Sequence, residues 1–268
     1  GTGYYHTGSF EIRMGRENGG TNFGCGLETV LSPNAKKWHF WECSATVGAW
    51  THAVMVYDGF ALTFWVNGVQ MCTKGSCSST NNINSYGLTG DIKSVSKPLY
   101  IGCLNSEWFS GDMKNLALYS VALDSKQIAK LYAANGDVGP PPVPYSPTAV
   151  PTASPTALPT VMGEMPKASS LIATYFTKQA FSTNKPNADM SGNKHDITGK
   201  VNVISSDYAQ FSSLSDGLTV ESLRNYDFGL GFTLGLMFRR KADDGRYAGI
   251  VGTGYYSSGS FEIRMGRE

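Results

Sequence analysis

Apolar and polar residues alternate along several short segments of the chain. The clearest runs are 232–239, 10–14, 50–56 and 62–66, where every second residue is apolar. Alternation with a period of two places successive side chains on opposite faces of a β-strand. Tyr57-Asp58-Gly59 and Asn67-Gly68 supply turns between such runs, and Asn-Gly is typical of tight hairpins. The pattern therefore predicts an all-β fold of antiparallel strands, arranged as a two-sheet sandwich or jelly roll.

One short helix is expected near residues 125–135. Asp124 can accept the first free backbone N–H groups, and Gln127 stands at the capping-box position three residues later. Gly136 then ends the helix as a C′ glycine. The apolar face of this helix is formed by Ile128, Leu131 and Tyr132.

The first 17 residues of the chain recur at its end. Residues 1–17 (GTGYYHTGSFEIRMGRE) and 252–268 (GTGYYSSGSFEIRMGRE) agree at 15 of 17 positions, with an offset of 251. We interpret the chain as a window on a tandem array with a period of about 251 residues. The alternative is a single gene product with a duplicated terminal strand, as in domain swapping or circular permutation. In the tandem interpretation, residues 1–137 end one jelly-roll module and residues 167–268 begin the next.

The segment between these two parts, residues 138–166, has a different composition. Residues 138–163 contain eight of the 12 prolines and no charged residue, which predicts an extended polyproline II linker. Hydroxyl groups beside prolines are typical of O-glycosylated stalks, and the alternative is a bare flexible linker. The candidate glycosylation sites are Ser146, Thr148, Thr152, Ser154, Thr156 and Thr160.

Three longer motifs carry a family resemblance. They are AWTHAVMVYDGFALTFWVNGVQ (49–70), LYIGCLNSEWFSGDMKNLALYSVALDSKQIAKLYA (99–133) and NADMSGNKHDITG (187–199). Together they resemble the laminin G-like, concanavalin A-type jelly-roll family, in the family's order only when the chain is read across the repeat boundary. The resemblance implies a two-sheet antiparallel sandwich that mostly binds glycans or proteins and also serves as a structural module.

All five cysteines lie before the linker, and four of them are candidate disulfide residues. A hairpin of residues 22–30 and 38–44, centred near Asn34, would place Cys25 opposite Cys43 within disulfide distance. Cys72 and Cys77 bracket a tight loop that a disulfide can close. The remaining cysteine, at position 103, is then either a buried thiol or the partner in a different pairing with residue 43 or 72. Two disulfides fit an oxidising compartment outside the cell.

Catalysis is not expected from this sequence. Related glucanases place their carboxylates as Glu-x-Asp-x-x-Glu on one strand, and this pattern does not occur here. The nearest acidic pair is Glu11 and Glu17, whose spacing of six residues does not suit that geometry. The four histidines have no nucleophile partner in the sequence. His52 lies on an apolar strand, so we expect a core histidine whose hydrogen bonds are satisfied.

Calcium is the one metal cofactor that the resemblance implies, although no cofactor is required. Several members of the family bind an ion at the edge of the sandwich, near the turn that corresponds to residues 187–199. Asp189 and Asn193 would supply the oxygen ligands. The alternative is that these two residues only form an Asx-type turn.

Three tryptophans are candidates for a carbohydrate-binding platform. They are Trp41, Trp65 and Trp108, of which the first two alternate away from the main apolar residues of their strands. The alternative is burial in the core or in a contact between modules.

Composition narrows the function further. A hydrophobic content of 41% is too high for a disordered chain, and a formal net charge of +1 argues against a basic nucleic-acid binder. No stretch approaches the ~18 apolar residues of a membrane span. The near-identity of the two copies favours a structural protomer of an extracellular, glycosylated filament whose partners are neighbouring copies. The alternative is a multivalent glycan-binding adhesin.

Overall fold

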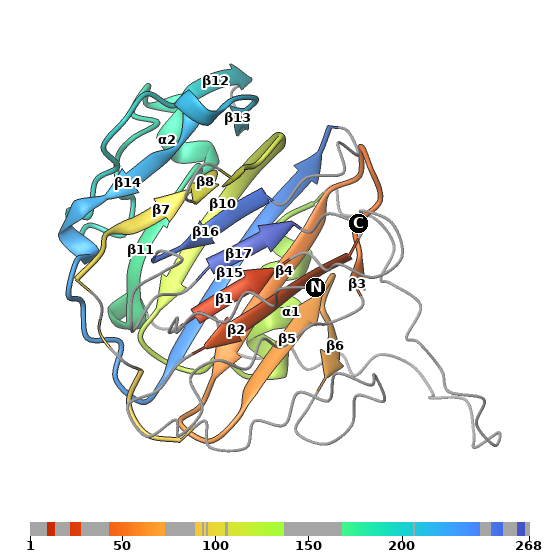
Figure 1. The fold of residues 1–268 in the computed structure, drawn as a ribbon, viewed down its shortest axis with the longest axis vertical. Coiled ribbons are helices and arrows are strands. Elements are labelled where there is room, and N and C mark those ends of the chain that lie inside the picture. The colour runs from red at the N-terminus through yellow and green to blue at the C-terminus, as the bar shows by residue number, and fades with distance from the viewer. Residues whose placement is uncertain are drawn as a thin grey trace, which may run out of the picture.

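Two β-sheets face one another in the structure, which is a computed structural model (Figure 1). The structure describes residues 10–13, 22–27, 43–72, 89–92, 94, 96–104, 107–136, 168–205, 207–241, 248–253 and 262–265. Most neighbouring strands in the described part are antiparallel, and only one helix exceeds seven residues there. The fold is therefore the all-β jelly-roll sandwich that the alternation predicts.

The first sheet has eight strands in the order β12-β13-β10-β15-β4-β5-β6, and β11 also pairs with β10. Its central strands β10 and β15 are nine residues long, and every pairing in this sheet is antiparallel. The strands are β4 (Thr51–Tyr57), β5 (Leu62–Val66), β6 (Val69–Cys72), β10 (Gly111–Tyr119), β11 (Leu171–Tyr175), β12 (Asn202–Ser205), β13 (Tyr208–Phe211) and β15 (Phe232–Arg240).

The second sheet has nine strands, most of them short. Seven follow the order β14-β7-β16-β17-β1-β2-β3, β9 pairs with β16, and β8 pairs with β9. The strands are β1 (Phe10–Arg13), β2 (Asn22–Leu27), β3 (Cys43–Ser44), β7 (Leu99–Ile101), β8 (Cys103–Leu104), β9 (Glu107–Trp108), β14 (Leu218–Val220), β16 (Ala248–Gly252) and β17 (Glu262–Met265).

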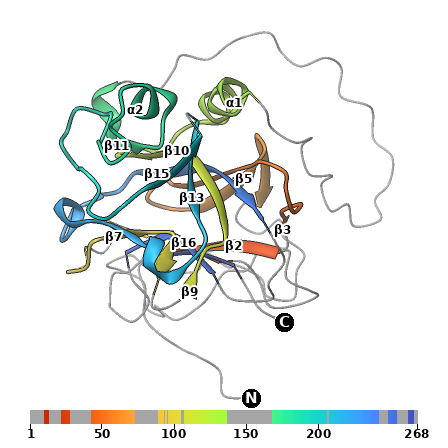
Figure 2. The same cartoon turned by 90° about the horizontal axis from the view of Figure 1, so that it is seen from above.

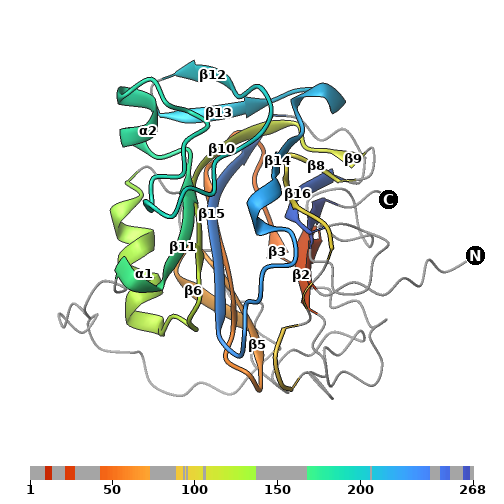
Figure 3. The same ribbon diagram turned by 90° about the vertical axis from the view of Figure 1, so that its left-hand side faces the viewer.

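The two α-helices, α1 (Ser125–Ala134) and α2 (Lys178–Ser182), lie outside the eight-stranded sheet. Figures 2 and 3 both show this sheet between the helices and the nine-stranded sheet. Three short 3₁₀ turns, η1 (Ala168–Ser170), η2 (Leu214–Asp216) and η3 (Glu221–Leu223), complete the described elements.

The main core lies between the two sheets, as the alternation predicts. On β5 the residues Leu62, Phe64 and Val66 are buried, whereas the residues between them are half-buried. On β15 the residues Phe232 and Phe238 belong to the same core. Apolar residues of the other strands in this sheet belong to the same core, and rings such as Phe109 and Phe238 pack edge to face, with centroids 6.2 Å apart.

The predicted turns form with the expected geometry. Asn67 and Gly68 both have positive φ angles, 48° and 78°, as a type I′ hairpin turn between β5 and β6 requires. Asp58 accepts hydrogen bonds from the backbone N–H groups of Phe60 and Ala61 at 2.9 and 2.7 Å, which closes the preceding turn. These two turns set the register of β4, β5 and β6.

The parts of the chain before and after the linker interleave in one sandwich. Strand β10 from the first part pairs with β15 on one edge, and with β13 and β11 on the other. A single chain therefore closes a complete sandwich from residues on both sides of the linker. The assignment of these two parts to successive modules of an array stays a prediction. Apart from the duplicated segment, each of these strands occurs once in the chain, so a second module is not present for comparison.

One expected register is wrong. Strands β2 and β3 are antiparallel as expected, but Cys43 lies opposite Phe23 rather than opposite Cys25. The hairpin is thus centred on position 33 instead of 34, which shifts each pair by two residues. Cys25 lies opposite Ile12 of β1. The side chains of these strands are outside the described residues, so the Cys25–Cys43 disulfide stays a prediction.

Candidate functional site

The outer face of the eight-stranded sheet carries a second apolar cluster, which α1 covers. Val54 and Val56 of β4 belong to it, because the residues between them face the main core. Ile128 of α1 is fully buried against this cluster. All seven residues of β4 are therefore buried, and the outer face is a second interior rather than a solvent face.

Local sequence signals position α1 over this face. Asp124 accepts from the N–H of Gln127 at 2.8 Å, and the Gln127 side chain accepts from the N–H of Asp124 at 3.0 Å. This is the predicted capping box. The preceding N–H of Leu123 donates to the Thr233 hydroxyl at 2.9 Å, which fixes the start of the helix to β15. Gly136, with φ 72°, follows the last turn as expected.

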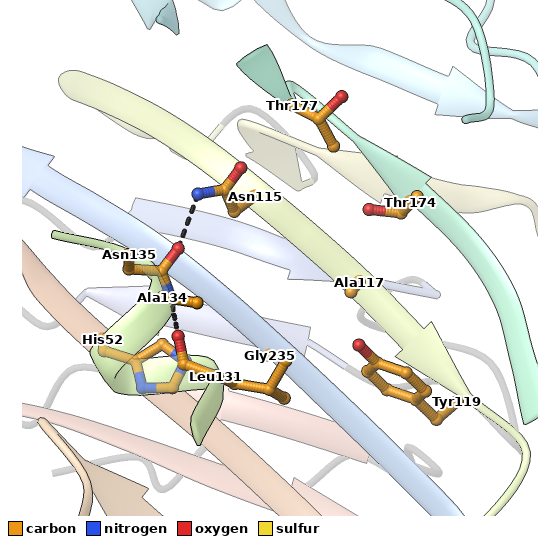
Figure 4. Close-up of a pocket in the computed structure, with 10 residues that line it drawn as sticks. All are labelled: His52, Asn115, Ala117, Tyr119, Leu131, Ala134, Asn135, Thr174, Thr177 and Gly235. Atoms are coloured by element: carbon orange, nitrogen blue, oxygen red, sulfur yellow. Dashed lines mark hydrogen bonds between the residues drawn. The ribbon is translucent and has the colours of Figure 1, made fainter. Parts of the chain in front are cut away.

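A pocket of about 260 Å³ lies between the C-terminal half of α1 and the sheet (Figure 4). A bulge in β10 between Lys114 and Ala117 brings Asn115, with φ 52°, to its rim. The Asn115 amide donates to the side-chain oxygen of Asn135, whose own amide donates to the Leu131 carbonyl at 2.7 Å. The residues that line the pocket are His52, Asn115, Ala117, Tyr119, Leu131, Ala134, Asn135, Thr174, Thr177 and Gly235.

His52 is the buried histidine of this pocket. Its side chain is 3% exposed, and its ring stacks against that of Tyr132 with centroids 5.9 Å apart. Its backbone N–H donates to the Asn67 side chain at 2.8 Å, but its ring atom Nδ1 has no hydrogen-bond partner among the described residues. The expectation of a core histidine is therefore correct in burial and wrong in hydrogen bonding. Burial lowers the pKa of His52 from 6.5 to about 4, so the ring is neutral at physiological pH.

The turn that was expected to hold calcium is held together by its own hydrogen bonds. Asp189 is 8% exposed, and both of its carboxylate oxygens accept from the chain. One oxygen accepts from the N–H groups of Thr174 and Ser191 at 3.0 and 2.9 Å, and the other from the Ser191 hydroxyl and the His195 N–H at 2.7 and 3.1 Å. Four donors match the acceptor capacity of a carboxylate.

The side-chain amide of Asn193 is hydrogen-bonded to β11, the strand that also contains Thr174. Its Nδ2 donates to the carbonyls of Leu171 and Ile172 at 2.7 and 2.8 Å, which joins the turn to β11. Among the described residues no group of three or more His, Cys, Asp or Glu side chains is arranged to hold a metal ion. The described contacts give Asp189 and Asn193 a structural role in the turn, and calcium binding there stays a prediction.

The tryptophans do not form a single platform in the described residues. Trp65 of β5 is half-buried against the cluster beneath α1, and its Nε1 donates to Thr63 at 3.2 Å. Trp108 lies on β9, in the other sheet. Trp41 lies outside the described residues, so its role stays a prediction.

An ion pair with a buried carboxylate is a feature that the sequence analysis missed. Asp112 of β10 is fully buried, and the Nη2 and Nε of Arg239 on β15 donate to it at 2.7 and 2.9 Å. Burial alone would lower the pKa of Arg239, but the hydrogen bond and charge of Asp112 raise it. The guanidinium also lies 4.8 and 5.0 Å from the ring centroids of Trp50 and Tyr208. Charged residues on two largely apolar strands were the available signal, and the pairing of Asp112 with Arg239 depended on the register of β10 with β15.

The duplicated segment forms two adjacent strands of the nine-stranded sheet. β1 and β17 are parallel, with Ile12 opposite Ile263 and Arg13 opposite Arg264. Each pair differs by 251 positions, so every residue lies beside its own counterpart in the other copy. On their outer edges, β1 pairs antiparallel with β2 and β17 pairs antiparallel with β16.

The remaining predicted sites are not within the described residues. Cys77 and the linker hydroxyls of residues 146–160 lie outside them, and Cys72 lies at the end of β6 with its side chain undescribed. Cys103 of β8 is half-buried. The disulfide between Cys72 and Cys77 and the linker glycosylation stay predictions.

Comparison with known proteins agrees with the fold. Residues 2–129 match a laminin G family model, described as the concanavalin A-like lectin/glucanases superfamily. This part of the chain is thus similar to a laminin G-like domain of this superfamily, as the sequence motifs predict. The matched residues include β1–β10, whereas β11–β17, which complete the sandwich, lie beyond them. Searches of curated proteins and of solved structures found no match.

Within the described part of the chain, no helix has the length and apolar character needed to cross a membrane. The superfamily includes both carbohydrate-binding and structural modules, and this is the class of function that the fold supports.

Proposed function

We propose that the chain is a structural module of an extracellular filament, in which copies of the duplicated strand join neighbouring modules. The observation that supports this most directly is the parallel pairing of β1 with β17 in a register of 251 residues. Two segments of near-identical sequence compete there for equivalent places in one sheet. Near-identical modules are what an array of uniform contacts requires.

One copy of the repeated strand, β1 or β17, is enough to fill the place between β2 and β16. β1 provides an antiparallel partner for β2, with Ile12 opposite Cys25, and β17 provides one for β16, with Ala248 opposite Met265. A single copy could pair with β2 on one edge and with β16 on the other, because the two copies share the sequence GSFEIRMGRE. One copy in each chain is then surplus, and it can pair into the sheet of the next chain or the next module. Addition of a strand by main-chain hydrogen bonds is an established mode of protein association.

Such an exchange is head to tail, because the N-terminal copy of one module meets the sheet of another. A head-to-tail contact that does not close on itself generates an open filament. The Pro/Ser/Thr-rich linker then spaces the modules, and its O-glycans shield it outside the cell. No catalytic step is part of this proposal.

Proline substitution in either copy tests the exchange. A proline in a central strand removes a ladder hydrogen bond, so Ile12→Pro and Ile263→Pro each remove one copy from the sheet. We expect the unmodified chain to form concentration-dependent oligomers or filaments, measured by sedimentation velocity and electron microscopy. Either single variant should stay monomeric, and so should an equimolar mixture of the two, because neither variant has a surplus copy.

A matched substitution controls for a general loss of packing. Val121→Pro changes an exposed residue that lies in neither copy of the repeat, between β10 and α1, and should leave assembly unchanged. Melting of each variant separates unfolding from loss of assembly. The proposal is wrong if the unmodified chain stays monomeric at all concentrations, or if the two single variants assemble as the unmodified chain does.

A further inference from the structure

Two large apolar side chains are exposed in adjoining loops at one end of the eight-stranded sheet. Phe60, in the turn between β4 and β5, is 71% exposed, and Leu230, just before β15, is 56% exposed. They are the most exposed large apolar side chains among the described residues. Their loops touch, because a Cβ atom added at Gly59 would stand 3.5 Å from Cδ2 of Leu230. Exposed apolar side chains that gather in one place mark a candidate interaction surface.

The same end of the sheet is acidic. Its three loops, which we define as the acidic end, are 57–61, 89–92 and 226–231. Backbone N–H groups of 89–92 donate to carbonyls of the other two loops at 3.3 and 2.8 Å, so the three form one surface. Each loop contributes one exposed carboxylate and no Lys or Arg. The carboxylates are those of Asp58, Asp91 and Asp227.

The opposite end of the same strands is cationic and aromatic. Figure 3 shows the turn between β4 and β5 at one end of the eight-stranded sheet and β13 at the other. Near β13, Nζ of Lys114 and Cζ of Arg239 lie 4.5 and 4.8 Å from the centroid of the half-buried Trp50 ring. The ring of Tyr208 packs edge to face on Trp50, with centroids 5.7 Å apart. We define these four residues and Lys241 as the cationic end.

Cations exceed carboxylates at the cationic end. Arg239 and Lys241 contact the buried Asp112 at 2.7 and 3.5 Å, and Asp207 adds one exposed carboxylate beside Tyr208. Three cations therefore face two carboxylates among the described residues of this surface. An attached cation–aromatic cluster of this kind offers both charge and apolar area to a partner.

The acidic and cationic ends complement one another. Two acidic ends in contact would bring like charges together, and so would two cationic ends, which disfavours a symmetric pair. Opposite ends attract, and such a head-to-tail contact can repeat without closing on itself. A membrane surface does not fit the acidic end, because anionic lipid headgroups repel carboxylates.

The described residues that flank the linker suit a head-to-tail order. α1 ends near the cationic half of β10, since Asn135 accepts from the amide of Asn115, which follows Lys114. The chain resumes at η1, where the Ser170 carbonyl accepts from the N–H of Ser120 at 2.8 Å, next to the opposite end of β10. In the array that the repeat predicts, the cationic end of one module and the acidic end of the next would thus be joined by the linker.

We propose that the acidic end of one copy docks on the cationic end of a second copy, with Phe60 and Leu230 against Trp50 and the carboxylates facing the cations. The contact is separate from the exchange of β1 and β17, which belong to the other sheet, and does not depend on it. Its surface is small, so we expect a dissociation constant on the order of 1 mM. A chain that cannot exchange strands therefore stays monomeric at the micromolar concentrations of sedimentation velocity.

NMR on the full-length Ile12→Pro chain tests the contact in the absence of strand exchange. The chain is diluted from about 2 mM to about 0.05 mM, a range that spans the expected dissociation constant. We expect the indole N–H signal of Trp50 and the amide signal of Gly59 to shift together, with one apparent dissociation constant. Ile263→Pro replaces Ile12→Pro if the latter does not fold.

A double substitution at the acidic end assigns the shifts. In the same background, Phe60→Ser with Leu230→Ser removes exposed apolar area and should weaken the contact by at least about tenfold. The concentration dependence of the Trp50 signal, at the other end of the sheet, should then disappear. Ala129→Ser is the matched control, because Ala129 is exposed on α1 and belongs to neither end. Its dissociation constant should equal that of the Ile12→Pro chain.

Mixing distinguishes a head-to-tail contact from a symmetric one. The labelled double variant keeps its cationic end, so adding unlabelled Ile12→Pro chain should restore the Trp50 shift, whereas adding unlabelled double variant should not. Signals of both ends that do not depend on concentration, or a dependence that the double variant retains, would overturn the proposal. Neither result bears on the strand exchange, because every chain in this experiment lacks a surplus strand.

Discussion

The two sheets of the sandwich differ in how uniquely their strands are specified. In the eight-stranded sheet the long strands β4, β10 and β15 have different sequences, and each has one set of antiparallel neighbours. The ion pair between the buried Asp112 and the half-buried Arg239 and the α1 helix add contacts on its outer face. In the nine-stranded sheet, two adjacent strands carry the same sequence.

This difference separates the part of the fold that must stay together from the part that can be exchanged. A shift of strands in the eight-stranded sheet would break the ion pair and move apolar side chains out of the core. An exchange of β1 for β17 replaces each side chain with an identical one. The first sheet therefore contains strands that cannot change places, and the second contains the two strands that the proposed assembly exchanges between copies.

The largest expected effect on the free energy of unfolding comes from the face of the eight-stranded sheet that packs in the main core. Phe238 of β15 is fully buried, so Phe238→Ala leaves a cavity and should lower the free energy of unfolding by about 3–5 kcal/mol. Urea denaturation measures the change. Phe60→Ala, at a side chain 71% exposed, should change it by less than ~0.5 kcal/mol. Equal effects of the two substitutions would contradict the assignment of stability to this sheet.

The second effect is the pH dependence of the free energy of unfolding that arises from His52, on the face of the eight-stranded sheet that α1 covers. His52 has a pKa of about 4 in the native state and 6.5 as its ordinary value, so the unfolded chain binds its proton first as the pH falls. The free energy of unfolding should be constant above about pH 6.5 and fall by on the order of 3 kcal/mol towards pH 4. Denaturation at several pH values measures the slope. His52→Leu should remove this part of it, and His195→Gln should retain it.

A smaller effect is expected at the start of α1. Asp124→Ala removes the N-cap of the capping box and should lower the free energy of unfolding by about 1 kcal/mol. Ser125→Ala, one residue further on and exposed, is the control and should change it by less than ~0.5 kcal/mol. A loss of several kcal/mol in the free energy of unfolding on Asp124→Ala would mean that α1 contributes more to the stability of this sheet than its capping box alone explains.

The smallest effect on stability is expected in the nine-stranded sheet. Deletion of residues 1–13 removes β1, but β17 has the same sequence and can pair with β2 in its place. The free energy of unfolding should then change by less than about 1 kcal/mol, a small part of the stability of a domain. A loss comparable to that of Phe238→Ala would contradict the equivalence of the two copies.

Local features were the ones that the sequence predicted well. The alternation in 62–66 depends only on which face of a strand is buried, and the Asn67-Gly68 turn depends on two positive φ angles. The capping box of Asp124 and Gln127 is likewise a matter of four successive residues. Each of these was confirmed because the physical cause lies within a few residues of the pattern.

Features that depend on distant contacts were missed or wrong. The burial of His52, whose Nδ1 has no partner among the described residues, depends on α1, which lies far along the chain and covers the outer face of β4. The Asp112–Arg239 pair requires two strands separated by the linker. The Cys25–Cys43 register failed by two residues because alternation defines the face of a strand but not the length of the loop between two strands.

Strand β10 has a consequence for how the chain responds to proteolysis. It precedes the linker, yet both of its edges are bonded to strands that follow the linker. A protease that cuts within residues 138–166 would therefore produce two fragments that remain one particle. The nicked protein should migrate as a single species in a native gel and separate into two bands only in denaturant. The linker thus joins two parts of one sandwich whose strands already hold them together.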